Sequence, residues 1–344
     1  MTAFRKPGDF RDARGRERVA GFELEVGNLA VRETARALAD RLGGTVREDN
    51  PFRAKVEGTA IGSVTVERDA EVLSTAKYRE ALHKWNIVFD ADTLAAEIER
   101  GVDRLAAVLI PCEVVTEPLR FEDFPRVNEI VAVLNALEAS GTGESIFYAF
   151  GLHLNPSAPD LEPSTLTAFT QAFLLVSDWI IDTAGVDISR RYFTSFINPY
   201  PDAFVERLLE PGYGDDPERF MDDYLTHNPT RNRALDMLPL LAEIDEARVR
   251  EAVREEERSL VSARPAFHYR LADCRPGDPE WSVGAEWNRW WVVERLAADD
   301  AMREALADEW RALRDETTLR RTARWVKTVA TFLTAHLDEM DGRS

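Results

Sequence analysis

Charged side chains recur at alternate positions inside otherwise apolar segments, and this pattern constrains the fold more than any other feature. The first example is GFELEVG, residues 21–27, in which Glu23 and Glu25 alternate with apolar residues. In an extended strand, alternate side chains lie on opposite faces, so the two glutamates share one face. Because neighbouring carboxylates repel each other, this face is either open to water or holds a cation or a basic side chain.

Later segments repeat this spacing and together predict a metal-binding face. VERD contributes Glu67 and Asp69, CEVVTEPL contributes Glu113, GLHLNP contributes His153 and Asn155, and AFHYRL contributes His268 and Arg270. A single histidine in a strand is more often a hydrogen-bonded structural residue than a ligand. A sheet face that gathered all of these carboxylates would be unfavourable without cations. Mg²⁺ is the expected ion, because it prefers carboxylate oxygen, accepts an occasional imidazole and leaves positions for water and phosphate.

The order of the predicted elements indicates an α+β fold. Strands are expected at 19–26, 45–48, 52–58, 63–68, 112–119, 146–156 and 266–271, and helices at 31–42, 92–109, 125–140 and over most of 165–260. Gly and Asn residues between the early strands favour an antiparallel meander. The tail, 283–341, is amphipathic and rich in tryptophan, so we expect it to pack on the main body. The simplest architecture is an antiparallel sheet decorated by helices.

Composition restricts the class of protein. The 344 residues carry a formal net charge of −19, which argues against nucleic-acid binding because phosphate neutralisation needs a basic surface. The two cysteines, Cys112 and Cys274, lack the spacing of a zinc site or a disulfide framework. The N-terminus has no secretory signal, and no run approaches the ~20 apolar residues of a membrane span. We therefore expect a cytoplasmic protein without nucleic-acid or membrane partners.

The segment HNPTRNRALDMLPLL, residues 227–241, predicts an anion site. Thr230 is placed to cap a helix that would carry Arg231 and Arg233. A helix N-terminus adds free amide protons and a partial positive charge, which favours an anion there. The alternative is that both arginines pair with surface acids of this acidic protein.

Two further segments combine arginines with aromatic residues. SRRYFTSFINPYP, residues 189–201, places Arg190 and Arg191 before an aromatic run, and in SARPAFHYRL, residues 262–271, Arg264 and Arg270 flank the last predicted strand. Arg270 is in step with His268, so it would bring positive charge to the acidic face. A phosphate bridged by metal requires that combination of charges.

Several common catalytic motifs are absent from the sequence. It contains no GxxxxGK[ST], GxGxxG, HExxH or GxSxG. P-loop, Rossmann, zincin and hydrolase-elbow mechanisms therefore lack their phosphate-binding or nucleophilic groups. GTGES at 141–145 is interpreted as a glycine-rich turn only.

Taken in order, the motifs resemble the putative amidoligase family, a branch of the carboxylate-amine ligases related to glutamate-cysteine ligase and glutamine synthetase. The motifs are GFELEVG, VERD, PCEVVTEPL, GLHLNP, NPTRNRALDMLPLL and RPAFHYRL, and the resemblance covers roughly residues 18–295. It implies a curved antiparallel sheet of about six strands with surrounding helices. It also implies that acidic strand residues hold two or three Mg²⁺ ions, and that ATP drives the joining of a carboxylate to an amine.

The resemblance implies roles for individual residues. The resemblance matches Glu23, Glu25, Glu113 and His153 to metal ligands and places His268 at a further ligand position, and the strand pattern adds Glu67 and Asp69 as candidate ligands. Arg270 matches the phosphate-side arginine of the family. The anion-site segments described above add Arg231 and Arg233 as candidate catalytic residues, and the candidate ATP-binding residues are Arg264, Asn228, Asn232 and Arg191. The sequence departs from the family pattern twice, because Asn155 replaces a second histidine and His268 replaces a glutamate.

These assignments predict an ATP- and Mg²⁺-dependent ligase that works through an acyl phosphate, with small-molecule carboxylate and amine substrates. Two alternatives stay open, namely another metal-dependent enzyme such as an amide hydrolase or phosphotransferase, and a non-catalytic scaffold that has lost metal binding. The expected organisation is an N-terminal arm at 1–18, a catalytic domain at 19–280 and a helical extension at 281–344. The tryptophan-rich tail could also form a homo-oligomer contact.

Overall fold

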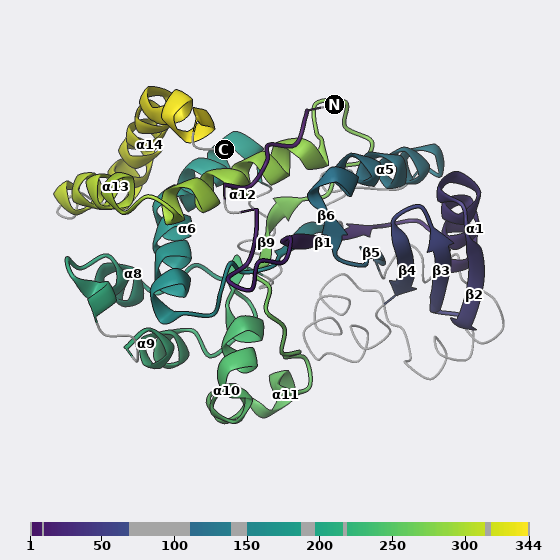
Figure 1. Ribbon diagram of the computed structural model, residues 1–344, viewed down its shortest axis with the longest axis horizontal. Helices are drawn as coiled ribbons and strands as arrows, with labels where there is room; N and C mark the ends of the chain where they lie inside the picture. The colour runs from purple at the N-terminus through teal and green to yellow at the C-terminus, as the bar shows by residue number, and fades with distance from the viewer. Residues whose placement is uncertain are drawn as a thin grey trace, which may run out of the picture. The chain divides into compact units, whose positions relative to one another are not determined.

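The structure is a computed structural model that describes residues 2–8, 10–68, 111–138, 150–186, 197–215, 219–313 and 318–342 (Figure 1). The chain divides into two compact units. Unit 1 comprises Met1–Ala20, Leu154–Ala272 and Gly284–Ser344, and unit 2 comprises Gly21–His153 and Asp273–Val283. The divisions at 20/21 and 153/154 fall inside strands β1 (Val19–Val26) and β7 (Gly151–Pro156), so both strands contribute residues to each unit.

Unit 2 contains the predicted meander. Its strand order is β2-β3-β4-β5-β1-β7, and β6 also pairs with β1. The pairs β2–β3, β3–β4, β4–β5 and β5–β1 are antiparallel. The new strands are β2 (Thr45–Asn50), β3 (Arg53–Thr59), β4 (Gly62–Arg68), β5 (Cys112–Thr116) and β6 (Leu119–Arg120).

Apolar side chains of these strands are buried by helices. Helix α1 (Val31–Leu42) contacts β3, β4 and helix α5 (Val127–Ala136), and a 3-10 helix, η2 (Phe121–Arg126), precedes α5. Phe22 of β1 makes an edge contact with Phe124 of η2, with ring centroids 5.1 Å apart. The period of two places the apolar residues of β1 on the buried face, which leaves its glutamates on the other face.

Unit 1 is mostly helical and has the strand order β7-β9-β8. Strands β8 and β9 pair antiparallel. Its elements are α6 (Pro163–Ala184), α8 (Asp202–Leu208), η3 (Tyr213–Asp215), α9 (Arg219–His227), β8 (Leu235–Asp236), α10 (Leu238–Ala252), α11 (Glu255–Arg258), β9 (His268–Asp273), α12 (Val283–Ala297), α13 (Asp300–Ala312) and α14 (Thr318–Gly342).

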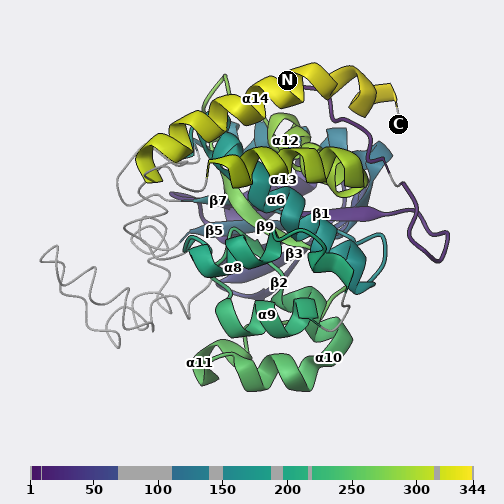
Figure 2. The ribbon, with the colours of Figure 1, turned by 90° about the vertical axis from the view of Figure 1, so that its left-hand side faces the viewer.

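Helix α6 forms the centre of unit 1. Figure 2 shows α13 and α14 lying over it, and both contact it. Phe169 of α6 stacks on Phe267 at 4.5 Å between ring centroids, and the indole of Trp325 donates to the Leu175 carbonyl at 3.0 Å. Among the described residues, α6 is the one helix that is long and apolar enough to cross a membrane. The sequence analysis had expected no segment of that kind. Since 61% of the most apolar window of α6 is buried within the protein, it also fits a core helix.

The N-terminal residues lie against helix α12 within unit 1. The indoles of Trp287 and Trp291 each donate to a backbone carbonyl, of Arg5 and Lys6 respectively, at 2.8 Å. Further along, Arg18 and Glu294 form a buried ion pair at 2.8 Å. These contacts hold both ends of the segment that precedes β1.

The α+β class is confirmed. The described residues contain nine strands, whereas the sequence pattern predicted seven and the resemblance implied about six; the two-residue strands β6 and β8 are too short to carry a periodic pattern. The predicted helix at 92–109 lies outside the described residues. The domain limits at 18/19 and 280/281 stay predictions.

Candidate functional site

Three glutamates stand in line across neighbouring strands of unit 2. Glu25 of β1 lies opposite Glu113 of β5, and Glu113 lies opposite Glu67 of β4. Neighbouring strands are about 4.8 Å apart, so residues in this register place their carboxylates side by side. We call Glu25, Glu113 and Glu67 the acidic row. On the far side of Glu67, Arg53 of β3 continues the register and pairs with it at 3.3 Å.

His153 of β7 joins this face of unit 2. Its Nδ1 lies 3.0 Å from Glu23 Oε2, and its Nε2 lies 3.6 Å from Glu25 Oε1. A carboxylate can only accept, so the first contact favours a proton on Nδ1 and leaves the Nε2 lone pair as a ligand. The Gly151 amide donates to Glu25 Oε2 at 2.6 Å, which fixes that carboxylate as well. Glu23 and Gly151 therefore orient the two candidate ligands.

The charge of the acidic row is only partly balanced. Burial raises the pKa of the Glu113 carboxyl well above its usual range. The negative charges of Glu23, Glu25 and Glu67 raise the same pKa further, and so does a hydrogen bond with Glu23. The structure thus holds Glu113 where a negative charge is unfavourable unless a cation is bound.

The donor set fits a hard divalent cation. Ligand atoms from Glu25, Glu113 and His153 all lie within 4.8 Å of one another. Two carboxylates and one imidazole suit Mg²⁺ or Mn²⁺, while thiolates, which would favour a softer ion, are absent from this group. Glu67 is not in the group, and its pairing with Arg53 accounts for its charge. Asp69, another predicted ligand, lies outside the described residues.

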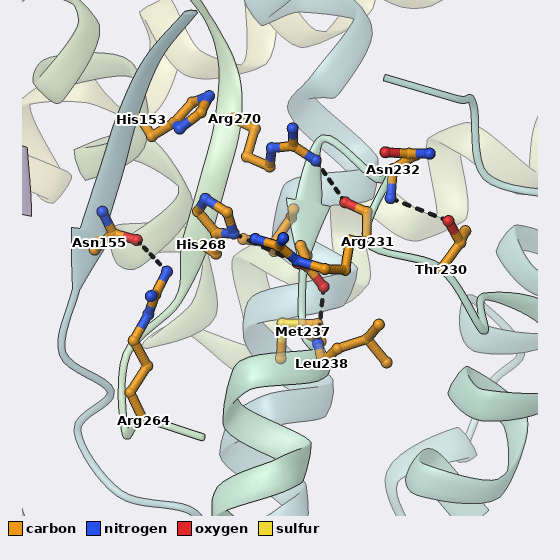
Figure 3. Close-up of polar contacts among 12 residues, drawn as sticks. His153, Asn155, Thr230, Arg231, Asn232, Met237, Leu238, Arg264, His268 and Arg270 are labelled. Carbon is orange, nitrogen blue, oxygen red and sulfur yellow. Dashed lines mark hydrogen bonds and ion pairs between the residues drawn. The ribbon is translucent and has the colours of Figure 1, made fainter. Parts of the chain in front are cut away.

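Several of the other predicted residues, Arg231, Asn232, Arg264, His268 and Arg270, form a polar cluster in unit 1 (Figure 3). Asp236 of β8 lies opposite His268 of β9, and its Oδ2 is 3.4 Å from His268 Nδ1. The same oxygen is 3.8 Å from Arg231 Nε, and Oδ1 accepts from the Leu238 amide at 3.0 Å. Asp236 is fully buried, so these donors compensate the loss of its hydration. The structure therefore places the predicted ligand His268 beside an aspartate that the sequence analysis did not select.

The three predicted catalytic arginines have different surroundings. Arg270 Nη1 donates to the Arg231 carbonyl at 2.6 Å, so these two residues lie side by side. Arg233 is buried and donates to the side chain of Asn228 at 2.8 Å and to the carbonyls of Pro199 and His227. Through these bonds Arg233 links its own segment to the segments around Pro199 and around His227. Arg233 and Asn228 therefore have a structural role here, and we propose neither as a catalytic or ATP-binding residue.

The expected helix over Arg231 and Arg233 is wrong. Residues 231–234 are not helical, and α10 begins only at Leu238, after the short strand β8. The pairing of β8 with β9 overrides the local preference for a helix. Thr230 instead accepts from the Asn232 amide at 3.2 Å, and Glu257 accepts from the Arg231 amide at 2.9 Å. In the part of the chain that the structure describes, no helix begins at these arginines, so the predicted anion site at a helix N-terminus is not formed there.

The sequence analysis missed two acids of unit 1, Asp236 and Glu257. Asp236 is the single acid in the apolar run ALDMLPLL, and a lone charge in such a run could have identified it. Glu257 follows a run of acids in EEER and carries no comparable signal. The predicted nucleotide-binding residue Arg264 donates to Asn155 at 2.9 Å, and Arg191 lies outside the described residues.

Comparison with known proteins adds one finding. A family model described as a putative amidoligase enzyme matches residues 16–292, which is most of the chain. The matched range includes the acidic row and the polar cluster of unit 1. No curated protein and no solved structure matches the chain.

Proposed function

Because the chain belongs to the putative amidoligase family, we propose that it is an ATP- and Mg²⁺-dependent ligase that joins a carboxylate to an amine. The acidic row is the observation that carries this proposal. Three opposed glutamates with an oriented histidine are costly for a fold and useful for binding a divalent cation. We further propose that the sheet is curved in the manner of glutamine synthetase and glutamate-cysteine ligase.

Glu25, Glu113 and His153 would hold the metal. When bound, Mg²⁺ would neutralise phosphate oxygens of ATP and favour phosphoryl transfer. Glu23 keeps His153 in the orientation and tautomer that a ligand needs, through the 3.0 Å contact. Gly151 restrains one oxygen of Glu25 and leaves the other near His153 Nε2. Arg270 and Arg231 are proposed to stabilise negative charge on the transferring phosphoryl group.

The proposed reaction has two steps. A substrate carboxylate oxygen attacks the γ-phosphorus of ATP, and ADP leaves. The nitrogen of a neutral amine then attacks the carbonyl carbon of the acyl phosphate, phosphate leaves with one former carboxylate oxygen, and the amine loses a proton. This chemistry requires positioned charges and no covalent nucleophile from the protein, in agreement with the absence of nucleophile motifs.

An isotope experiment tests this chemistry directly. Purified protein is incubated with Mg²⁺, ATP and a panel of carboxylates and amines, and ADP release is measured with and without the amine. For any active pair, a carboxylate labelled with ¹⁸O should transfer one labelled oxygen to the released phosphate, detected by mass spectrometry. Amide cleavage without ATP would indicate a hydrolase, and phosphorylation without an amine would indicate a phosphotransferase. Calorimetry that detects neither Mg²⁺ nor an ATP analogue would indicate a scaffold.

Variants test the residues. Glu23→Ala and Arg270→Ala are each expected to lower ATP turnover by about 10²-fold or more while leaving the melting temperature nearly unchanged. Glu48→Ala, which removes a surface acid paired with Arg32, is the control and should turn over ATP normally. Near-normal turnover in either test variant would remove that residue from the proposal.

A further inference from the structure

Arg264 is a half-buried cation whose side chain is held by a neutral partner. Its Nη2 donates to Asn155 Oδ1 at 2.9 Å, and Figure 3 shows the arginine reaching toward that side chain. Its backbone is fixed too, since its amide donates to the Pro239 carbonyl at 3.1 Å and its carbonyl accepts from the Ala266 amide at 2.9 Å. The side chain of Arg264 is therefore fixed at its backbone and at one nitrogen of its guanidinium within unit 1.

The charge of Arg264 is not compensated within the described residues. No described carboxylate forms an ion pair with it, and its buried Nε has no hydrogen-bond acceptor there. Arg18, Arg207 and Arg254 of unit 1 differ from it, because each of them pairs with a carboxylate. Desolvating a cationic donor without an acceptor is unfavourable, so this arrangement is suited to an anionic ligand.

We propose that Asn155 is a positioning residue, whose Oδ1 holds the guanidinium of Arg264 so that its Nε edge binds an oxyanion. A guanidinium presents its donors in a planar fork, which matches a carboxylate or a phosphate. The oxyanion is either a phosphate of the nucleotide or a carboxylate of the substrate. Only the identity of the oxyanion rests on the proposed ligase function; the anion site itself does not.

This role differs from the one that the family pattern suggests for position 155. The family pattern has a second histidine there, whereas the asparagine oxygen in this chain is already engaged by a cation. An oxygen that accepts from a guanidinium is a poor ligand for a second cation. The two roles predict opposite effects on metal affinity, which makes them separable by experiment.

The test measures anion and metal binding on the full-length protein. Calorimetry measures the affinity for a non-hydrolysable ATP analogue in the presence of Mg²⁺, as the phosphate source, and separately for succinate, as the carboxylate source. Electron paramagnetic resonance measures the affinity for Mn²⁺. Asn155→Leu and Arg264→Gln should each weaken one of the two anionic probes by about 10-fold or more, and the double variant should be no weaker than Arg264→Gln alone. Mn²⁺ affinity should stay within about twofold of the wild type in all three variants.

Asn155→Asp distinguishes positioning from metal ligation. A carboxylate at this position would pair with Arg264 and compete with the anionic probe, so probe binding should weaken while Mn²⁺ affinity stays unchanged. Tighter Mn²⁺ binding in Asn155→Asp together with weaker binding in Asn155→Leu would overturn the proposal in favour of a ligand role. Unchanged binding of both anionic probes in Asn155→Leu, or no binding of either probe by the wild type, would also overturn it.

Controls separate folding and activity from the inference. Arg250→Gln removes an exposed arginine of α10 that pairs with Glu246, and it should leave binding of both probes unchanged. Circular dichroism checks folding, and if Asn155→Leu does not fold, Asn155→Asp and Arg264→Gln decide the matter. If the wild type binds a probe through Arg264 but forms no amide with any substrate pair, the ligase function fails and the anion site stands.

Discussion

Carboxylates in the two units have opposite surroundings. In unit 2, Glu113 lies between two other glutamates, and burial and these neighbours raise its pKa. In unit 1, burial alone would raise the pKa of Asp223 and Glu257, but hydrogen bonds from arginines and other donors lower both. Charges that stabilise a fold are usually arranged in the second way. An acid opposed by acids therefore marks the part of the protein that is arranged for a ligand.

The buried ion pair of unit 1 should show the largest effect on stability. Glu294 accepts two hydrogen bonds from Arg18 and one from the indole of Trp290, and both charged side chains are less than 5% exposed. Glu294→Ala would leave a buried cation unpaired, so we expect the free energy of unfolding to fall by about 3–5 kcal/mol. Denaturant titration measures this change. Glu304→Ala, which removes an exposed acid that pairs with Arg311, is the control and should cost under about 1 kcal/mol.

The acidic row should respond in the opposite way. Glu25→Ala removes a candidate ligand, and we expect Mn²⁺ affinity to fall by about 10²-fold, because removing even an outer partner of a metal site costs about 10- to 100-fold. The free energy of unfolding of the metal-free protein should not fall, since the variant relieves repulsion with Glu113. Calorimetry and thermal unfolding in a chelator measure the two effects. A large loss of stability with unchanged metal affinity would mean that the row serves the fold.

Local pattern predicted which residues face the same way, and long-range pairing decided which residues meet. The alternation in β1 correctly placed Glu23 and Glu25 on one face, because period two is a property of any strand. The alignment of Glu25 with Glu113 and Glu67 depends on the register of β1, β5 and β4, which no local signal determines.

The wrong helix prediction at Arg231 has the same origin, namely long-range strand pairing. A cap residue followed by good helix formers predicted a helix, but the chain gains more by pairing β8 with β9. The contact between Arg264 and Asn155, 109 residues apart in the chain, was equally invisible in the sequence. Residue types at the candidate site were thus predictable, and their partners were not.

Asp223 should make the stability of unit 1 depend on pH. Asp223 is buried, which alone would raise its pKa, but hydrogen bonds from Arg207 and Tyr213 and the charge of Arg219 hold it below the usual value. The unfolded chain therefore binds more protons in this window, so stability is present above about pH 3.8 and is lost as the pH falls through the lowered pKa.

Asp223→Asn should remove part of this dependence. We expect the variant to lose about 1–2 kcal/mol of unfolding free energy at pH 6 and less at pH 3, where the carboxyl group is largely protonated in the unfolded chain and part of the wild-type stabilisation is already lost. Urea titrations at the two pH values measure the difference. An equal loss at both values would show that the charge of Asp223 does not contribute to stability.

The smallest expected effect has the reverse sign and belongs to Glu113. Burial raises its folded-state pKa above the ordinary value of 4.5, so above that pH the folded protein binds more protons than the unfolded chain. In the metal-free protein, stability should therefore fall as the pH rises from about 4.5 through the raised pKa. Glu113→Gln cannot ionise, so it should abolish this fall and stabilise the metal-free protein at pH 8 by up to about 1 kcal/mol.

Mg²⁺ should reverse the relative stability of the wild type and Glu113→Gln. It binds the ionised wild-type row and not the variant, so saturating Mg²⁺ should raise the melting temperature of the wild type and leave that of Glu113→Gln unchanged. Thermal unfolding at pH 8 in a chelator and in Mg²⁺ measures both states. Lower stability of Glu113→Gln in the chelator would mean that the Glu113 carboxylate is balanced by the protein itself, and the contrast between the two units would then disappear.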